Sequence, residues 1–122
     1  MTARDALKAY EVGLNTHRFD AVAHLIAPDA VFWFSDGNHR GIGAIRIAFE
    51  ETWRVLNNDT YWLDEVEWIA DGETVAVSIY RFNRKSEIDG RSVSGSGRGT
   101  TVLNRFADQW RIVHEHLSAN PG

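Results

Sequence analysis

The first part of the chain carries apolar residues at helical spacing, which predicts two helices before Pro28. Residues 3–16 form an apolar stripe, and Thr2 followed three positions later by Asp5 is typical of a helix capping box. The stripe resumes near Asp20 and ends before Pro28, because a proline forces the preceding residue out of helical dihedral angles. We therefore expect one helix over 3–16 and a second, short helix from Asp20.

A strand and a third helix are predicted next. Residues 31–34 form a wholly apolar run after a turn signal, which is typical of a short buried strand. After Gly41 a single apolar stripe runs toward the polar residues 57–59 and consists of Ile45, Phe49, Trp53 and Leu56. The order expected so far is helix, helix, strand, helix.

Beyond residue 60 the pattern changes to alternation with a period of two, which predicts antiparallel strands. They are expected over 61–69, 74–84 and 92–106, with tight turns at Asp71-Gly72 and Asp89-Gly90, and a hairpin over 97–118 that turns at 107–109 closes the sheet. A straight strand over 92–106 would span roughly 50 Å. This strand must therefore bend or carry a bulge.

Three glycines share one face of the last hairpin. The turn sets the cross-strand pairs on that face, which are Leu103–Val113, Thr101–Glu115 and Gly99–Leu117. Gly95 and Gly97 continue the same face, so three side chains are missing in a row. Either this face is hollow and leaves room for a ligand, or the glycines serve curvature alone and neighbouring aromatic rings fill the gap.

Helices first and strands last indicate an α+β domain, in which a curved sheet in the shape of half a cone wraps around three N-terminal helices. The helices and the inner face of the sheet would enclose an apolar cavity. On the outer face, Val75, Val77 and Ile79 are too apolar for water. We expect this face to pack on a second copy of the chain around a two-fold axis.

Composition and charge exclude several classes of protein. Residues 1–122 have the length of a single domain, and a net charge of −4 without a cluster of Lys or Arg argues against a nucleic-acid surface. There are no cysteines, the N-terminus lacks the apolar run of a signal peptide, and no segment is long enough to span a membrane. We expect a cytoplasmic protein with no membrane partner.

The chain is rich in aromatic residues, which line pockets or subunit interfaces as often as they fill cores. It has five tryptophans, six phenylalanines and three tyrosines. By their helical faces, Tyr10, Phe49 and Trp53 are candidate pocket residues, and Tyr80 joins them because it lies opposite Gly99. One bulge would bring Arg81 inward in place of Tyr80.

Glu115 is the candidate for acid–base chemistry, because it is the one carboxylate on the glycine-bearing face of the last hairpin. Burial in an aromatic cavity would raise its pKa and make it a general acid or base. The alternative is a structural ion pair with Arg81, Arg98 or Arg105.

His114 and His116 share the other face of the last strand. Two imidazoles could chelate a metal, but the sequence supplies no third ligand nearby. We expect interface or core histidines there, no metal site and no cofactor.

Two parts of the chain resemble the nuclear transport factor 2-like superfamily, and within it the SnoaL-like domains. The N-terminal part runs from Ala9-Tyr10 through Phe19-Asp20 and Asp29-Ala30-Val31 to Gly41. The C-terminal part combines Gly97-Arg98 with Trp110 to Ser118, and this tail is similar to bacterial relatives of the calcium/calmodulin-dependent protein kinase association domain. The resemblance implies a cone-shaped, cystatin-like α+β barrel, commonly dimeric, in members that range from enzymes to binding modules.

The resemblance also tests particular activities. The tyrosine of the ketosteroid isomerases falls on Tyr10, but their general-base aspartate falls on Phe34 and their protonated acid near Thr101, so that chemistry is not expected here. Phe34 becomes a pocket candidate by the same comparison. Arginines of the kinase association domain fall on Thr101 and Leu117, so its anionic pocket is not reproduced.

Three functions therefore stay open. The first is a module that binds a small, largely apolar molecule with Tyr10, Phe34, Phe49, Trp53, Tyr80, Thr101, Glu115 and Leu117. The second is a cofactor-free isomerase, cyclase or hydrolase that uses Glu115 with Tyr10 and Thr101. The third is an assembly domain that works through its outer sheet face, which monomeric behaviour in analytical ultracentrifugation would contradict.

Overall fold

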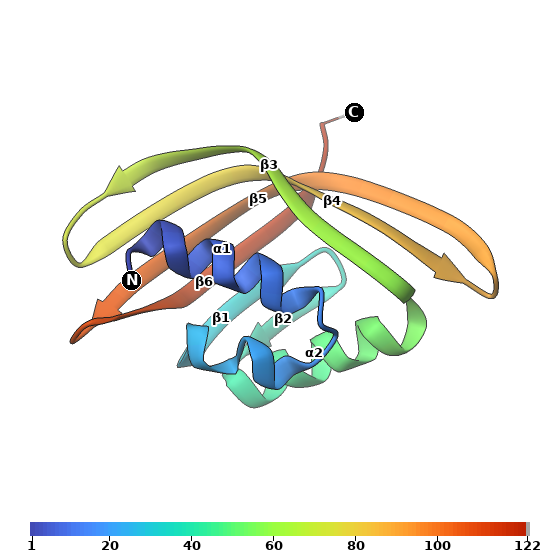
Figure 1. Ribbon diagram of the computed structural model, residues 1–122, viewed down its shortest axis with the longest axis horizontal. Helices are drawn as coiled ribbons and strands as arrows, with labels where there is room; N and C mark the ends of the chain where they lie inside the picture. The colour runs from blue at the N-terminus through green and yellow to red at the C-terminus, as the bar shows by residue number, and fades with distance from the viewer. Residues whose placement is uncertain (122) are drawn as a thin grey trace.

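The computed structural model describes residues 1–121, in which a long curved sheet arches over the helices (Figure 1). Its helical elements are α1 (Ala3–Leu14), two 3-10 turns at Phe19–Ala21 and Ala23–Leu25, and α2 (Ile42–Val55). Its strands are β1 (Ile26–Phe34), β2 (Gly37–Arg40), β3 (Asn57–Asp71), β4 (Val75–Ile88), β5 (Arg91–Phe106) and β6 (Gln109–Ala119). The predicted α+β class is confirmed.

The six strands form one mixed sheet in the order β2-β1-β6-β5-β4-β3. Only the β1–β6 pair is parallel; the other neighbours are antiparallel. The sheet is strongly curved but not closed into a barrel, and α1 lies within its concave side (Figure 1). The inner face of the sheet and the two helices therefore share one core.

The capping box predicted for the first helix is present. The Thr2 hydroxyl accepts a hydrogen bond from the Asp5 backbone N–H, and the Asp5 carboxylate accepts one from the Thr2 N–H. The second predicted helix is wrong, because residues 19–25 form only two 3-10 turns before β1 begins at Ile26. A segment this short, with a strand starting two residues before Pro28, has no room for a stable α-helix.

A strand was missed at Gly37–Arg40, which the sequence treats as a turn leading to a helix. Its polar residues carry no period-two apolar signal, and it is held by backbone pairing with β1, from Phe34–Gly37 to Val31–Arg40. Edge strands of this kind are defined by their partner more than by their own residues. The result is a β1–β2 hairpin, both strands of which contact α2.

The register of β4 and β5 is continuous from Val75–Asn104 to Ile88–Arg91, and Asp89-Gly90 forms the turn with positive φ at both residues. This turn was predicted, and the unbroken register places Tyr80 inside and Arg81 outside. The long β5 strand thus bends without a bulge of its own (Figure 1).

The bulge lies in the partner strand β6. Leu103 pairs with Ile112, and Val102 pairs with His114, so Val113 is the extra residue. The predicted Leu103–Val113 pair is wrong for this reason, whereas the Thr101–Glu115 and Gly99–Leu117 pairs are present. Because a bulge inverts the alternation, Ile112 and Glu115 both point to the core.

Aromatic side chains occupy part of the space beside the three glycines of β5. Phe82 lies over the bare backbone of Gly97, and Tyr80 lies over that of Gly99. A Cβ added to Gly95, in contrast, would meet nothing within 4 Å. Aromatic rings therefore pack on two of the glycines, as the second alternative expected, and the third is exposed at the surface.

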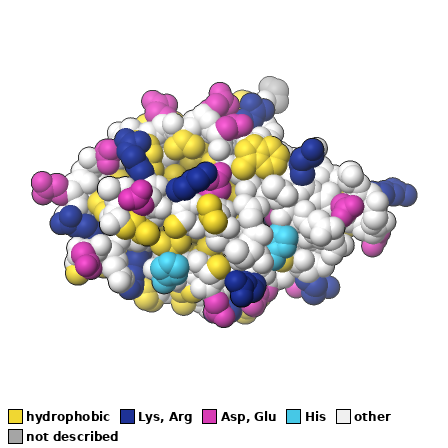
Figure 2. Space-filling model, viewed as in Figure 1, with side chains coloured by type: hydrophobic (Ala, Val, Ile, Leu, Met, Phe, Trp, Pro, Cys, Tyr) yellow, Lys and Arg dark blue, Asp and Glu magenta, His cyan; other side chains and the backbone are white. Residues whose placement is uncertain are grey.

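The outer surface mixes apolar and charged side chains. Figure 2 shows, in the orientation of Figure 1, apolar side chains interspersed with charged ones over α1 and the neighbouring strands. On the convex side of the sheet Val75 is exposed, and Val77 and Ile79 are half-buried. A second subunit on this side stays a prediction. No helix among residues 1–121 is long and apolar enough to cross a membrane.

We expect Gly97→Ala to lower the free energy of unfolding by about 1–3 kcal/mol, because its Cβ would overlap the Ser118 carbonyl oxygen and the Phe82 ring. Gly95→Ala is the matched control on the same face of the same strand. It should leave stability unchanged or raise it slightly, since the site is open and the unfolded chain loses freedom. Urea denaturation measures both, and equal destabilisation by the two substitutions would contradict the packing described here.

Candidate functional site

A cavity of about 220 Å³ lies between the helices and the inner face of the sheet. Side chains from α1, the β1–β2 turn, α2, β3, β4 and β6 form its walls. They are Tyr10, Leu14, Phe34, Ser35, Asp36, Phe49, Thr52, Trp53, Asp59, Tyr61, Phe82, Arg84, Glu115 and Leu117. None of Gly95, Gly97 and Gly99 is among these lining residues, so the cavity does not lie over the glycine row.

Aromatic rings make up much of the wall. The Phe34 and Phe49 rings are stacked with centroids 5.9 Å apart, and Trp53 follows Phe49 along α2 with ring centroids 5.7 Å apart. On the opposite wall Tyr61 stacks on Phe82 with centroids 6.2 Å apart. Walls of this kind favour an apolar, ring-shaped occupant and lower the local dielectric constant.

The Glu115 carboxyl lines this cavity, and its residue is only 2% exposed. The Tyr10 hydroxyl donates a hydrogen bond to Glu115 Oε2 over 3.3 Å, and the Tyr80 hydroxyl approaches Oε1 at 3.5 Å. Thr101 Oγ1 lies 2.7 Å from the Tyr80 hydroxyl. Among residues 1–121 the groups in direct contact with the carboxyl are thus hydroxyls, and none of them is a cation.

Burial raises the pKa of the Glu115 carboxyl from 4.5 to about 7. The hydroxyls of Tyr10, Tyr80 and Thr101 oppose this rise, because they hydrogen-bond to the charged form. Burial and the nearby Glu115 charge also raise the pKa of Tyr10 and Tyr80 well above the usual value, so both phenols remain donors. At neutral pH the site therefore contains a carboxyl that can either give or take a proton.

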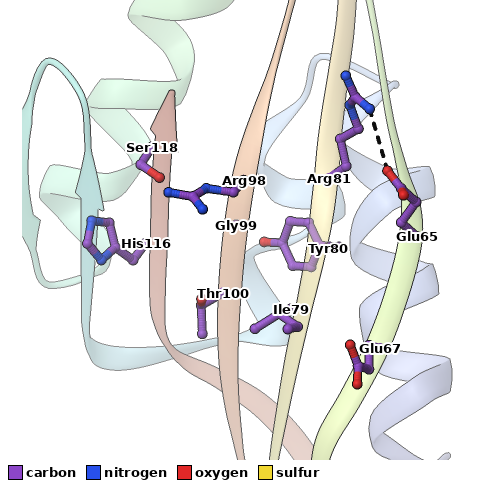
Figure 3. A pocket seen from close by; sticks show the side chains of 10 residues that line it. All are labelled: Glu65, Glu67, Ile79, Tyr80, Arg81, Arg98, Gly99, Thr100, His116 and Ser118. Atoms are coloured by element: carbon purple, nitrogen blue, oxygen red, sulfur yellow. Dashed lines mark ion pairs between the residues drawn. The ribbon is translucent and has the colours of Figure 1, made fainter. Parts of the chain in front are cut away.

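The arginine pairing considered for Glu115 does not occur among residues 1–121. Arg81 points to the convex side, where it pairs with Glu65 at 3.5 Å. Figure 3 shows this ion pair in a depression of that outer face, with Arg98 on the neighbouring strand. Arg98 and Arg105 are both exposed. An arginine does influence Glu115, but it is Arg84, whose charge lowers the carboxyl pKa from a distance.

A second polar cluster lies at the rim of the cavity and was not predicted. Arg84 Nε donates to Asp59 Oδ1 over 2.8 Å, and Ser86 Oγ donates to the same oxygen over 2.8 Å. The Asp59 side chain is only 2% exposed. The alternation of β4 places Tyr80, Phe82, Arg84 and Ser86 on one face. Which face this is depends on the register between the strands, so the alternation alone did not predict the cluster.

The structure gathers most of the predicted site residues around one space. Those that line the cavity are Tyr10, Phe34, Phe49, Trp53, Glu115 and Leu117. Tyr80 and Thr101 lie behind Glu115 and do not form part of the cavity surface. Tyr61 and Phe82 complete the wall and were missed. The side that Tyr61 faces depends on bulges in β3 that the sequence does not reveal, whereas the alternation of β4 already placed Phe82 on the same face as Tyr80.

His114 and His116 lie away from this cavity. His114 Nδ1 is 2.6 Å from the Val31 carbonyl oxygen, and both imidazoles contact the edge of Trp33. Within the described part of the chain no group of three or more His, Cys, Asp or Glu side chains is placed to hold a metal ion. The two histidines have structural contacts instead.

Solved structures share this fold at low sequence identity. A nuclear transport factor 2-like superfamily protein from Salmonella enterica is 20% identical, with a TM-score of 0.89, over 97% of this chain and 88% of that one. A calcium/calmodulin-dependent protein kinase II association-domain-like protein from Xanthomonas campestris is 21% identical, with a TM-score of 0.83, over 94% and 83%. A protein with a cystatin-like fold from Caulobacter vibrioides is 21% identical, with a TM-score of 0.83, over 98% and 89%. These likenesses confirm the fold suggested by the sequence.

No curated protein sequence matches this chain. The model of one protein family does match, over residues 6–118, and it describes a SnoaL-like domain. That range includes most of α1, all of α2 and of strands β1 to β5, β6 except its last residue, and the complete cavity wall. The chain therefore belongs to the family of SnoaL-like domains.

Proposed function

We propose that this protein binds a small, largely apolar molecule in the cavity of its cone. The observation that carries the proposal is the combination of an aromatic wall with the buried Glu115 carboxyl, which lines the space and is contacted by hydroxyl groups. A well-formed apolar pocket with few convergent polar groups is the usual form of a small-molecule site. The SnoaL-like fold, with helices inside a curved sheet, is consistent with this role.

The volume limits the size of the ligand. A space of about 220 Å³ is smaller than the pockets that hold drug-sized molecules, which are roughly 300–1,000 Å³. It is larger than an engineered cavity of about 150 Å³ that accepts benzene. The site therefore suits one ring with a short substituent.

The hydroxyl groups around Glu115 define the polar end of the ligand. Below its pKa of about 7 the carboxyl can donate to a carbonyl oxygen, and above it the carboxylate can accept from a hydroxyl. Tyr10 lines the same cavity and keeps its proton under both conditions. The ligand is therefore expected to carry one neutral oxygen function at its buried end.

We expect Leu117→Phe to weaken binding of the probe 4-methylphenol by about tenfold or more, because the larger ring fills the cavity. His116→Phe is the matched control, since it adds the same ring to the exposed, opposite side of β6. Titration followed by NMR chemical shifts gives both affinities. If Leu117→Phe bound the probe as well as the unmodified protein, the ligand site would not be this cavity.

Proton transfer by Glu115 is a second candidate function. The observation that favours it is a raised carboxyl pKa of about 7 in direct contact with the Tyr10 hydroxyl, 3.3 Å away. A general base works best when its pKa is close to the operating pH. Tyr10 would polarise a substrate oxygen, while Tyr80 and Thr101 hold the carboxyl in place from behind.

We expect the protein to accelerate exchange of the α-hydrogens of cyclohexanone in D₂O, at a rate that rises as the pH passes through about 7 and Glu115 ionises. Glu115→Gln should abolish the acceleration, because the amide cannot take up the proton. His116→Gln on the outer face should not alter it. Full exchange activity in Glu115→Gln would remove Glu115 from this role. Mass spectrometry of the recovered ketone measures the exchange.

A further inference from the structure

Arg84 occupies the place where the cavity meets the surface. It lies on the inner face of β4, between Phe82 and Ser86 in the alternation of that strand. Its side chain forms part of the cavity wall and also of a wider groove of about 590 Å³ beside α2. Asp36 and Thr52 are shared by the same two spaces. A molecule that entered the cavity from this groove would therefore pass the guanidinium group.

The guanidinium is held from one side only. Its Nε donates to the buried Asp59 carboxylate over 2.8 Å, and the group lies over the Tyr61 ring, 5.3 Å from the ring centroid. Within the described range, 1–121, neither Nη atom donates a hydrogen bond to another residue. Asp59 is itself fixed by Ser86. The Arg84 side chain is thus oriented through Nε while four N–H donors stay available.

Open space lies beside this group. Gly95 pairs with Arg84 across the β4–β5 ladder, and a Cβ at Gly95 would meet nothing within 4 Å. The Arg84 side chain is 31% exposed, so water reaches it but does not surround it. A partly desolvated guanidinium with an adjacent gap is a strong site for a planar oxyanion.

We propose that Arg84 binds the carboxylate of the ligand, and that the protein therefore takes small ring-containing carboxylic acids. The ring lies among Phe49, Trp53 and Tyr61, and the carboxylate lies at the mouth against the Nη atoms of Arg84. This inference rests on the proposed function, because it assigns the class of the molecule that the cavity holds. A bidentate pair between arginine and a carboxylate supplies both the affinity and the orientation.

The surrounding charges fix this orientation. A carboxylate at the inner end would face Glu115, which is 2% exposed and becomes a second negative charge as it ionises. At the mouth Asp59 is already bonded to Arg84. The other acidic residues of the groove are Asp36, whose side chain is 78% exposed, and Glu51, which is 59% exposed and paired with Arg54, so both are screened by water. The acid end of the ligand is consequently favoured at the mouth, and its ring end inside.

The test compares two probes of equal shape, 3-phenylpropanoate and 3-phenylpropanamide, by isothermal titration calorimetry at about pH 6, where the acid is ionised and Glu115 is mostly protonated. The unmodified protein should bind the acid at least about tenfold more tightly than the amide. Arg84→Gln should remove this preference, because the acid loses its bidentate partner and its affinity falls to that of the amide. Arg81→Gln, on the outer face of the same strand, should retain it.

A double variant separates the loss of the Arg84 contact from a loss of folding. Arg84→Gln alone leaves the buried Asp59 carboxylate without its cation, which destabilises the fold. Asp59→Asn combined with Arg84→Gln replaces both charged groups by neutral amides, and it should also bind the two probes equally. Circular dichroism melting confirms that each variant is folded before titration.

The outcomes separate this inference from the proposed function. If the unmodified protein binds acid and amide equally, the cavity binds ligands but Arg84 does not select a carboxylate. That result overturns this inference and leaves the proposed function standing. A preference that persists in the folded double variant also overturns it, since another group would then hold the acid. If neither probe binds the unmodified protein, the proposed function and the inference fall together.

Discussion

The Glu115 side chain is buried where α1, β4, β5 and β6 meet, and the groups that contact its carboxyl are hydroxyls, with no cation among them. A fully buried carboxylate without a cation is costly, so the site shifts its pKa and keeps the proton to near neutrality. An ion pair with an arginine would have had the opposite effect and produced a permanently charged, inert carboxylate. The absence of a direct cationic contact, within the described residues, is therefore what leaves this interior chemically responsive.

The curved sheet creates the space that this carboxyl faces. Bare backbone at Gly97 and Gly99 lets the rings of Phe82 and Tyr80 fold onto β5, so the strand bends while its register with β4 stays continuous. The bulge at Val113 then turns Glu115 inward on the neighbouring strand. Bending, packing and the placement of the functional group are thus coupled, and a change at any of these positions alters the cavity.

The sequence predicted what depends on local chemistry. The capping box at Thr2, the apolar stripe of α2 and the turn at Asp89-Gly90 are determined by neighbouring residues, and all three are present. The edge strand β2, in contrast, exists only because β1 pairs with it, and a bulge such as that at Val113 depends on three-dimensional curvature. The same difference between local and long-range determinants explains which site residues were predicted. Glu115 and Tyr10 were found by face and family resemblance, whereas the Arg84 cluster depends on a long-range register that no local pattern reveals.

The central claim is that the fold holds the Glu115 carboxyl in a buried, hydroxyl-lined position where it is neither permanently charged nor permanently neutral. The most direct measurement is an NMR titration of the protein with glutamate labelled by ¹³C at the carboxyl carbon, with the Glu115 resonance assigned by its loss in Glu115→Gln. The account predicts a titration midpoint at a pH of about 7. A midpoint near the ordinary value of 4.5 would show a solvated or ion-paired carboxylate and would contradict the account.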